Sequence, residues 1–296
     1  MAKKKYHLTK TKVANLDEDI KNNRQDYIGG SDIGSIMGAS PWKSAYTLWA
    51  EKTGLITPED ISDKEAVWWG TVEEDLVAKR FTMKTGIKVK KSNYAYGVEE
   101  YPYLRGHIDR IGVKRNVGLE CKTTSSYNKT KYDEGEVPPY HWWQCQFYMF
   151  VTGMKEWYLA TKRDNQFYIS SIQRDDEAIE QMLIACEDFW EHVQNGEPVE
   201  IDDSDSTAET IQELYPEETP GTICDLTDSE EYLIAIDALN GQKKNIETQQ
   251  ELYKNHIKSV MQDSERGETE NYIVTWKANR AGTRVFKIRK REEKGE

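Results

Sequence analysis

The sequence has few cysteines, no long apolar run and no apolar leader. Its 296 residues include four cysteines, which lie 24, 41 and 38 positions apart. This spacing excludes a CxxC zinc or redox motif and a dense disulfide framework. No apolar run approaches the ~18–20 residues that a membrane span needs, and the lysines at 3–5 are followed by polar residues rather than by the apolar core of a secretory signal. We therefore expect a soluble intracellular protein.

One long stretch of the chain also lacks basic residues. From Asp175 to Gln242 there are 21 acidic residues and no lysine or arginine. The two flanks therefore hold all 40 basic residues against 31 acidic ones, although the whole chain carries a net charge of −12. Because local charge sets the field near a groove, a phosphate-binding surface is compatible with either flank. For the acidic stretch itself, a role in solubility is the simpler interpretation.

Aromatic residues, in contrast, are plentiful, and nine Trp and seventeen Tyr exclude wholesale disorder. Changes in composition predict a first domain at 1–194, an acidic linker with three prolines at 195–227 and a second unit at 228–296. Residues 1–24 are polar and basic, and we expect a loose arm there. Hydrophobic periodicity then predicts helices at 63–84, 140–152 and 176–194, and strands at 87–97, 104–111, 117–122, 156–162 and 166–173.

The second unit is predicted to consist of a long helix and a hairpin. Mostly apolar residues recur at alternating steps of four and three along the row Tyr232, Ile236, Leu239, Lys243, Ile246, Gln250, Tyr253, Ile257 and Val260. The row is either a coiled-coil seam or the apolar face of a helix that lies on the main domain. The hairpin at 272–289 is rich in arginine and lysine, which suits either a grip on a phosphate backbone or a solvated basic terminus. The helix could instead dock a partner or a neighbouring subunit.

Two acidic residues are predicted to meet in the hairpin formed by the strands at 104–111 and 117–122. This hairpin can place Asp109 beside Glu120, and two carboxylates in a half-buried sheet repel each other unless a cation lies between them. Oxygen ligands completed by water suit Mg²⁺ or Mn²⁺. Lys122 shares a face with Glu120 and would orient or deprotonate an attacking water, or stabilise a phosphate. A surface salt bridge between Lys122 and a carboxylate is the alternative interpretation.

Two polar residues interrupt the apolar faces of the predicted helices. Glu74 lies within the apolar stripe of the helix at 63–84, and Gln146 lies within that of the helix at 140–152. A buried polar group is costly without a partner, so we expect both to border one shared cleft. A shift of one position would point Glu73 or Gln144 inward instead.

Five motifs, taken in order, resemble the phage-type YqaJ nucleases, which are relatives of bacteriophage lambda exonuclease within the PD-(D/E)XK superfamily. The resemblance covers roughly residues 24–194. The motifs are Gly29-Gly30-Ser31-Asp32-Ile33-Gly34, Gly70-x-x-x-Glu74, Gly106-His107-Ile108-Asp109, Leu119-Glu120-Cys121-Lys122 and Tyr140-x-x-x-Gln144-x-Gln146. The resemblance implies an α/β core with a mixed central sheet flanked by helices, here followed by the C-terminal helix and hairpin.

The resemblance also implies a metal centre. Asp109 and Glu120 match the metal-binding acids, the main-chain carbonyl of Cys121 matches a further ligand, and Lys122 matches the catalytic lysine. Ile108 replaces the proline of the nominal Pro-Asp motif. The implied metal is Mg²⁺, with Mn²⁺ as a substitute, and the cysteine spacing lacks the clustering of iron–sulfur nucleases, so we expect no such cluster.

Further residues take roles from the same resemblance. Glu74 matches a helix carboxylate that supports the metal site, and Gln146 matches the last residue of a Gln-x-Gln motif. Arg24 and Ser31 match the residues that hold the 5′-phosphate of duplex DNA. A Gly-Gly-Ser turn at a helix N-terminus does offer N–H groups to a phosphate, although ordinary helix capping explains it equally well.

The implied function is a Mg²⁺-dependent 5′–3′ exonuclease that acts on double-stranded DNA ends and prepares them for single-strand annealing. The family implies a phage or prophage protein in the bacterial cytoplasm, often a ring-shaped trimer with a single-strand-annealing recombinase as partner. One alternative is an endonuclease that cuts structured or single-stranded DNA. Another is a DNA-binding assembly protein that has lost catalysis, although the intact set of two acids and a lysine argues against it.

Overall fold

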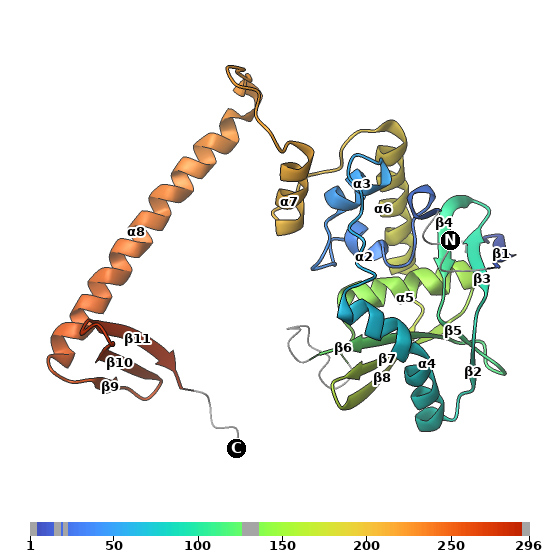
Figure 1. Cartoon of the computed structure of the whole chain (residues 1–296), viewed down its shortest axis with the longest axis horizontal. Helices are drawn as coiled ribbons and strands as arrows, with labels where there is room; N and C mark the ends of the chain where they lie inside the picture. The colour runs from blue at the N-terminus through green and yellow to red at the C-terminus, as the bar shows by residue number, and fades with distance from the viewer. Residues whose placement is uncertain (1–4, 15–18, 20–22, 126–135, 292–296) are drawn as a thin grey trace. The chain divides into compact units, whose positions relative to one another are not determined.

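The computed structural model describes residues 5–14, 19, 23–125 and 136–291. The chain divides into two compact units, Met1–Glu218 and Thr219–Glu296 (Figure 1). None of the helices in these ranges is long and apolar enough to cross a membrane.

The helices of the first unit begin and end at residues suited to those positions. Asp175 caps the first turn of one helix by accepting hydrogen bonds from the N–H groups of Glu177 and Ala178. Gly86 ends another in the left-handed conformation, with φ at +74°, which glycine adopts without a steric penalty. The elements are η1 (Arg24–Asp26), α2 (Ile33–Ile36), α3 (Ala45–Lys52), α4 (Glu65–Thr85), α5 (Pro139–Thr152), α6 (Asp176–Asn195) and α7 (Asp205–Leu214).

A five-stranded mixed sheet lies at the centre of the first unit. Its strands, in spatial order, are β2 (Val89–Lys91), β5 (Arg110–Gly112), β6 (Gly118–Thr124), β7 (Glu156–Arg163) and β8 (Gln166–Gln173). Strands β6 and β7 are parallel, and α5 lies between them in the sequence; the other neighbours are antiparallel. The expectation of a mixed α/β core is therefore confirmed.

A second sheet adjoins the first and consists of β1 (Leu8–Lys12), β3 (Tyr94–Val98) and β4 (Tyr101–His107). The chain passes from this sheet to the five-stranded one within two residues, Ile108 and Asp109, because β4 ends at His107 and β5 begins at Arg110. The prediction of one continuous strand at 104–111 is wrong for this reason. The bend frees Asp109 from the regular alternation of a strand.

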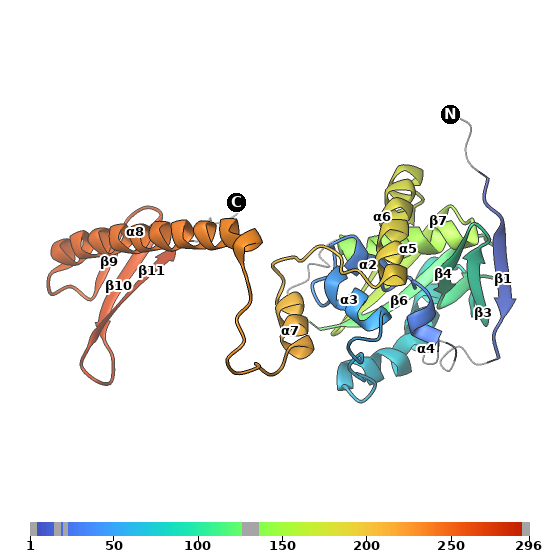
Figure 2. The same cartoon turned by 90° about the horizontal axis from the view of Figure 1, so that it is seen from above.

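The five-stranded sheet is covered on both faces. Helix α4 packs Val77 and Phe81 against Leu119 and Ala160 on one face. On the other face, α5 lies between the sheet and the helices α2, α3 and α6, as Figures 1 and 2 show. The residues that fill this larger core and are no more than 2% exposed include Trp157, Phe147, Phe150, Leu159 and Met182. Buried strands and helices thus hold β6, the central strand of this sheet, in place.

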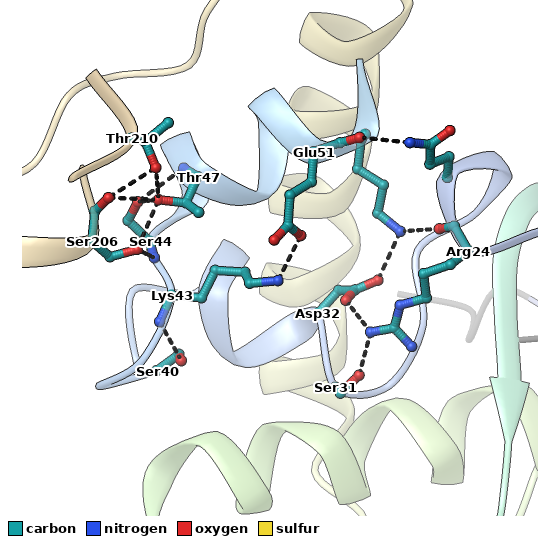
Figure 3. Close-up of polar contacts among 12 residues, drawn as sticks. Arg24, Ser31, Asp32, Ser40, Lys43, Ser44, Thr47, Glu51, Ser206 and Thr210 are labelled. Carbon is teal, nitrogen blue, oxygen red and sulfur yellow. Dashed lines mark hydrogen bonds and ion pairs between the residues drawn. The ribbon is translucent and has the colours of Figure 1, made fainter. Parts of the chain in front are cut away.

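Most predicted elements are confirmed, but the strand predicted at 87–97 is divided into β2 and β3, which belong to different sheets. Two elements are added near the ends of the first unit. Part of the expected loose arm is a strand, β1, whose Leu8–Lys12 pairs with β3, whereas 1–4, 15–18 and 20–22 lie outside the described residues. The expected linker at 195–227 contains α7. The Thr207 hydroxyl on this helix donates to Ser44 Oγ at 2.8 Å. The Thr47 hydroxyl lies 2.7 Å from Thr210 Oγ1, as Figure 3 shows.

The second unit contains the predicted helix and hairpin. Helix α8 (Glu230–Met261) follows the short turn η3 (Thr227–Ser229), and the hairpin strands are β10 (Tyr272–Ala278) and β11 (Arg284–Lys290), with β9 (Arg266–Glu268) added at the edge. Arg284 fixes the end of α8 to the hairpin. Its guanidinium stacks 3.6 Å from the centre of the Trp276 ring and donates to the carbonyls of Gln262 and Ser264, each at 2.8 Å.

We predict that Gly118→Ala lowers the free energy of unfolding of the first unit by about 1–3 kcal/mol, since overpacking a filled core has this cost. A Cβ at Gly118 would lie 2.3 Å from ring carbons of the fully buried Trp157. Gly70→Ala is the control, because its Cβ would lie 3.4 Å from the nearest atom and alanine favours a helix. Urea unfolding compares the two, and equal midpoints would contradict the packing described here.

Candidate active site

A cavity of about 480 Å³ opens at the end of β6. The break between β4 and β5 contributes Asp109, strand β6 contributes Glu120 and Lys122, and helix α4 contributes Glu74. The other residues that line the cavity are Trp42, Ala66, Val67, Gly70, Thr71, Cys121, Thr123, Thr124, Tyr140 and His141. Four predicted site residues, from helix α4, the break before β5 and strand β6, are thus brought together.

Asp109 is held in place by the backbone of the neighbouring strand. The N–H of Cys121 donates to its Oδ2 at 2.8 Å. Burial, reinforced by the negative charges of Glu120 and Glu74, raises the pKa of Asp109 well above its ordinary value, and Lys122 only partly opposes this. These surroundings therefore favour the protonated form of Asp109 unless a positive charge is placed beside it.

Glu120 is nearly inaccessible to solvent, with 2% of its side chain exposed, and only one of its oxygens is satisfied. Oε1 accepts from Lys122 Nζ at 2.6 Å and from Gln144 Nε2 at 2.9 Å. Oε2 is buried and has no hydrogen-bond partner among the described residues. A buried carboxylate oxygen without a partner is costly, so this atom marks a place for a cation or a donor.

The lysine at the centre of the cavity is charged. Burial opposes the charge of Lys122, but Glu120 and then Asp109 raise its pKa above the ordinary value. The Lys122 side chain is 28% exposed and lines the cavity.

Helix α4 presents Glu74 to the cavity, as expected. Arg110, which is 3% exposed, pairs with Glu74 through Nη1 and with Asp75 through Nη2, the latter at 2.5 Å. Glu73 instead pairs with Lys162 Nζ at 3.0 Å. The alternative in which Glu73 faced the site is therefore wrong, and Arg110 is a positioning partner that the sequence reasoning did not identify.

Helix α5 presents Gln144 rather than Gln146 to the cavity acids. Gln146 is fully buried, and its amide donates to the carbonyl of Gln173 and accepts from the N–H of Asp175, each at 2.9 Å. The expected position of Gln146 in the cleft is wrong, because its amide joins the end of β8 to the start of α6. Gln144 contacts Glu120 instead, as the alternative register allowed.

The site suits a hard divalent cation, in line with the expectation for the acids. The unpartnered Oε2 of Glu120 and the carboxylate of Asp109 are the oxygen donors that Mg²⁺ and Mn²⁺ prefer. In the described part of the chain, no three acidic, histidine or cysteine side chains are close enough together to hold a metal ion. Backbone, water or substrate oxygens would therefore complete the coordination of an ion bound there.

A second polar cluster contains the residues expected to bind phosphate. Arg24 Nη2 donates to Ser31 Oγ at 2.6 Å and to Asp32 Oδ1 at 2.5 Å (Figure 3). Lys52 Nζ lies 3.0 Å from Asp32 Oδ2 and also donates to the carbonyls of Arg24 and Tyr27, each at 2.5 Å. Burial opposes the charge of Asp32, but Arg24 and Lys52 hold its pKa below the ordinary value. Two cations face one carboxylate, which leaves the cluster with a positive charge.

A chain of contacts joins this cluster to the cavity. The Gly-Gly turn packs closely on Tyr148, since a Cβ at Gly30 would lie 2.5 Å from its ring. The Tyr148 hydroxyl accepts from Gln144 Nε2 at 2.8 Å, and the same nitrogen donates to Glu120. The sequence reasoning missed Lys52 and Tyr148, although a lysine among the apolar residues of α3 was a possible signal.

The YqaJ-like viral recombinase domain matches residues 19–155. A Bacillus subtilis (strain 168) protein, named Uncharacterized protein YqaJ, is 32% identical over 292 residues, which are 95% of this chain and 90% of that protein.

Solved structures of one exonuclease share the fold. The alkaline exonuclease LHK-Exo from Laribacter hongkongensis has a TM-score of 0.50 and 18% identity, and covers 60% of this chain and 93% of its own. LHK-Exo in complex with dAMP gives the same values. The PD-(D/E)XK type of α/β core expected from the motifs is thereby confirmed.

We predict that Lys122→Met lowers the free energy of unfolding by about 3 kcal/mol, because it leaves Glu120 charged and buried without its ammonium partner. Adding Glu120→Gln to this variant should recover most of the loss, since a neutral amide needs no counter-charge. Urea unfolding at pH 7 without divalent ions measures both. If the single variant were as stable as the unaltered protein, the ion pair would contribute nothing.

Proposed function

The chain belongs to the family of YqaJ-like viral recombinase domains, and on this premise we propose that it is a metal-dependent nuclease that degrades one strand of duplex DNA from its 5′ end. The family and the exonuclease fold support a nuclease. The direction of degradation, the dependence on Mg²⁺ and the role in recombination are the parts that we propose.

The proposal rests on the environment of the two carboxyl groups, Asp109 and Glu120. A buried carboxylate oxygen without a partner on Glu120 lies in the same cavity as Asp109, whose pKa burial and neighbouring charges raise. A divalent cation would relieve both, held by Asp109, Glu120 and the main-chain carbonyl of Cys121. When bound, Mg²⁺ or Mn²⁺ would offset charge on the scissile phosphate and lower the pKa of a water ligand.

The protein's own side chains would then prepare the reaction. We assign Lys122 to donate hydrogen bonds to the attacking water or the phosphate, since its side chain lines the cavity. Gln144 holds the Glu120 carboxylate through the bond to Oε1, and Arg110 holds Glu74 at the rim. Preorganised charges and dipoles of this kind stabilise charge that develops in a transition state.

Selection of the 5′ end would depend on the cluster around Arg24. The Arg24 side chain is 38% exposed and its guanidinium donates to Ser31 Oγ, so both residues can meet a terminal phosphate at the Gly-Gly-Ser turn. Asp32 and Lys52 hold the arginine there. We therefore propose this cluster as the 5′-phosphate site.

The biological role follows from the product. Removal of one strand leaves single-stranded DNA, and we propose that an annealing recombinase takes it up in the cytoplasm of a bacterial host during phage-type recombination. A ring-shaped trimer, as the resemblance implies, would retain the enzyme on its substrate.

Digestion of linear and circular duplexes tests the activity. With Mg²⁺, the protein should release nucleotides from 5′-phosphorylated linear DNA and leave a covalently closed circle intact, and EDTA should stop the reaction. Lys122→Ala should lower the rate at least about 100-fold, the scale of a lost electrostatic contact to a transition state. Lys162→Ala, which alters a neighbouring lysine paired with Glu73, should retain activity. Cleavage of the circle would instead identify an endonuclease.

Substrates with and without a terminal phosphate test the Arg24 cluster. We expect the unaltered protein to prefer a 5′-phosphate, and Arg24→Gln to reduce that preference roughly 10- to 100-fold, since a charged hydrogen bond contributes about 1.5–3 kcal/mol. Lys43→Gln is the matched control, because this nearby lysine pairs with Glu51. A full preference in Arg24→Gln would exclude the cluster as the phosphate site.

A further inference from the structure

Helix α8 exposes a row of mostly apolar side chains. Tyr232, Ile236, Leu239, Ile246 and Tyr253 are each 55–65% exposed within the described part of the chain. Over its 32 residues, α8 extends for about 48 Å. An exposed apolar row of this length marks a surface that binds another protein surface.

The spacing of the row fits a second helix. Steps of four and three place the residues on one seam, into which the side chains of a facing helix can insert. Only Lys243 and Gln250 interrupt the apolar character of the row between Tyr232 and Val260. The surface is therefore shaped for a partner with the same repeat.

The charges of α8 indicate which helix pairs with it and in which relative orientation. Its first part, 230–242, has three acidic residues and no basic one, whereas 243–261 has four lysines and two glutamates. Parallel pairing of two copies would place like charges together and would face Lys243 with its own copy. Antiparallel pairing places the acidic part of each helix beside the basic part of the other. We propose that two copies of this chain pair through their α8 helices in antiparallel orientation.

The sequence of the seam supports this register. In an antiparallel pair, residues that precede a step of four lie beside residues that precede a step of three on the other helix. With the helices fully overlapped, the layers are Tyr232 with Ile257, Ile236 with Tyr253, Leu239 with Gln250, and Lys243 with Ile246, each occurring twice by symmetry. Every layer then contains at least one apolar residue, and each polar interruption lies beside an apolar side chain.

An apolar groove lies where the seam ends. It has a volume of about 550 Å³ and is lined by Ile257 and Val260 of α8 and by Tyr272, Val274 and Ile288 of the sheet. The bonds from Arg284 to the carbonyls of Gln262 and Ser264 hold sheet and helix together around it. In the proposed register, the partner's Tyr232 comes beside Ile257, so the groove receives the most apolar end of the partner helix.

The resulting contact is symmetric and separate from the nuclease site. Each copy contributes the same surface, as in a twofold interface. Because none of its residues lies in the first unit, the pairing can join two nuclease units whatever assembly those units form themselves. It would also stand if the proposed exonuclease activity failed.

Mass measurement of the full chain tests the pairing. We expect Ile246→Asp to halve the mass of the assembly in sedimentation equilibrium, since a charge enters the centre of the seam. Thr248→Asp introduces the same charge on the opposite face of α8 and should leave the mass unchanged. Circular dichroism checks that both variants retain the helix. An unchanged mass in a helical Ile246→Asp protein would overturn the proposal, as would a monomeric unaltered protein at high concentration.

Cysteine cross-linking tests the direction. In a Cys224→Ser background, a mixture of Ile236→Cys and Tyr253→Cys proteins should form a disulfide-linked pair, because these positions share a layer. Neither variant alone should do so, since two copies of position 236 would lie about 25 Å apart along the helices. Cross-linking of either variant to itself would indicate parallel pairing and contradict the proposal, and the Cys224→Ser protein supplies the background.

Discussion

The electrostatics of the cavity depend on the contacts that the two carboxylate oxygens of Glu120 make. One oxygen is occupied by an ammonium and an amide, and the other is buried without a partner. The arrangement depends on the positive charge of Lys122, since burial of a carboxylate without a positive partner is costly. The neighbouring Asp109 adds a second negative group that the same lysine only partly offsets. The fold thus places two carboxyl groups beside one ammonium in the cavity, which favours the binding of a further positive charge where we propose that a phosphodiester binds.

The cavity acids are linked by direct contacts to the turn at Gly30. Gln144 uses one nitrogen to contact both Glu120 and Tyr148, and the Tyr148 ring supports the turn at Gly30. A side chain larger than hydrogen at Gly30 would displace the ring. The two sites that we assign to the scissile phosphate and the terminal phosphate therefore share one rigid support, helix α5.

Much of this arrangement was predictable, and the errors have physical causes. The stripe on α4 identified Glu74 correctly because one face of that helix is buried and the other is exposed. The same reasoning misplaced Gln146, since α5 is buried on almost every side and its apolar pattern defines no single inward face. Asp109 was assigned to a strand face, but it lies at a bend between sheets that alternation does not reveal. Arg110 and Lys52 act through contacts distant in sequence, which a single sequence does not show.

The passage of the chain between its two sheets has a mechanical consequence. Asp109 lies at the junction where the backbone passes from the three-stranded sheet to the five-stranded sheet, whereas Glu120 lies within the five-stranded sheet. Anything that draws the two carboxylates together also fastens the sheets to each other. Occupancy of the cavity and rigidity of the junction between the sheets are therefore coupled. A looser junction would move Asp109 and Glu120 apart.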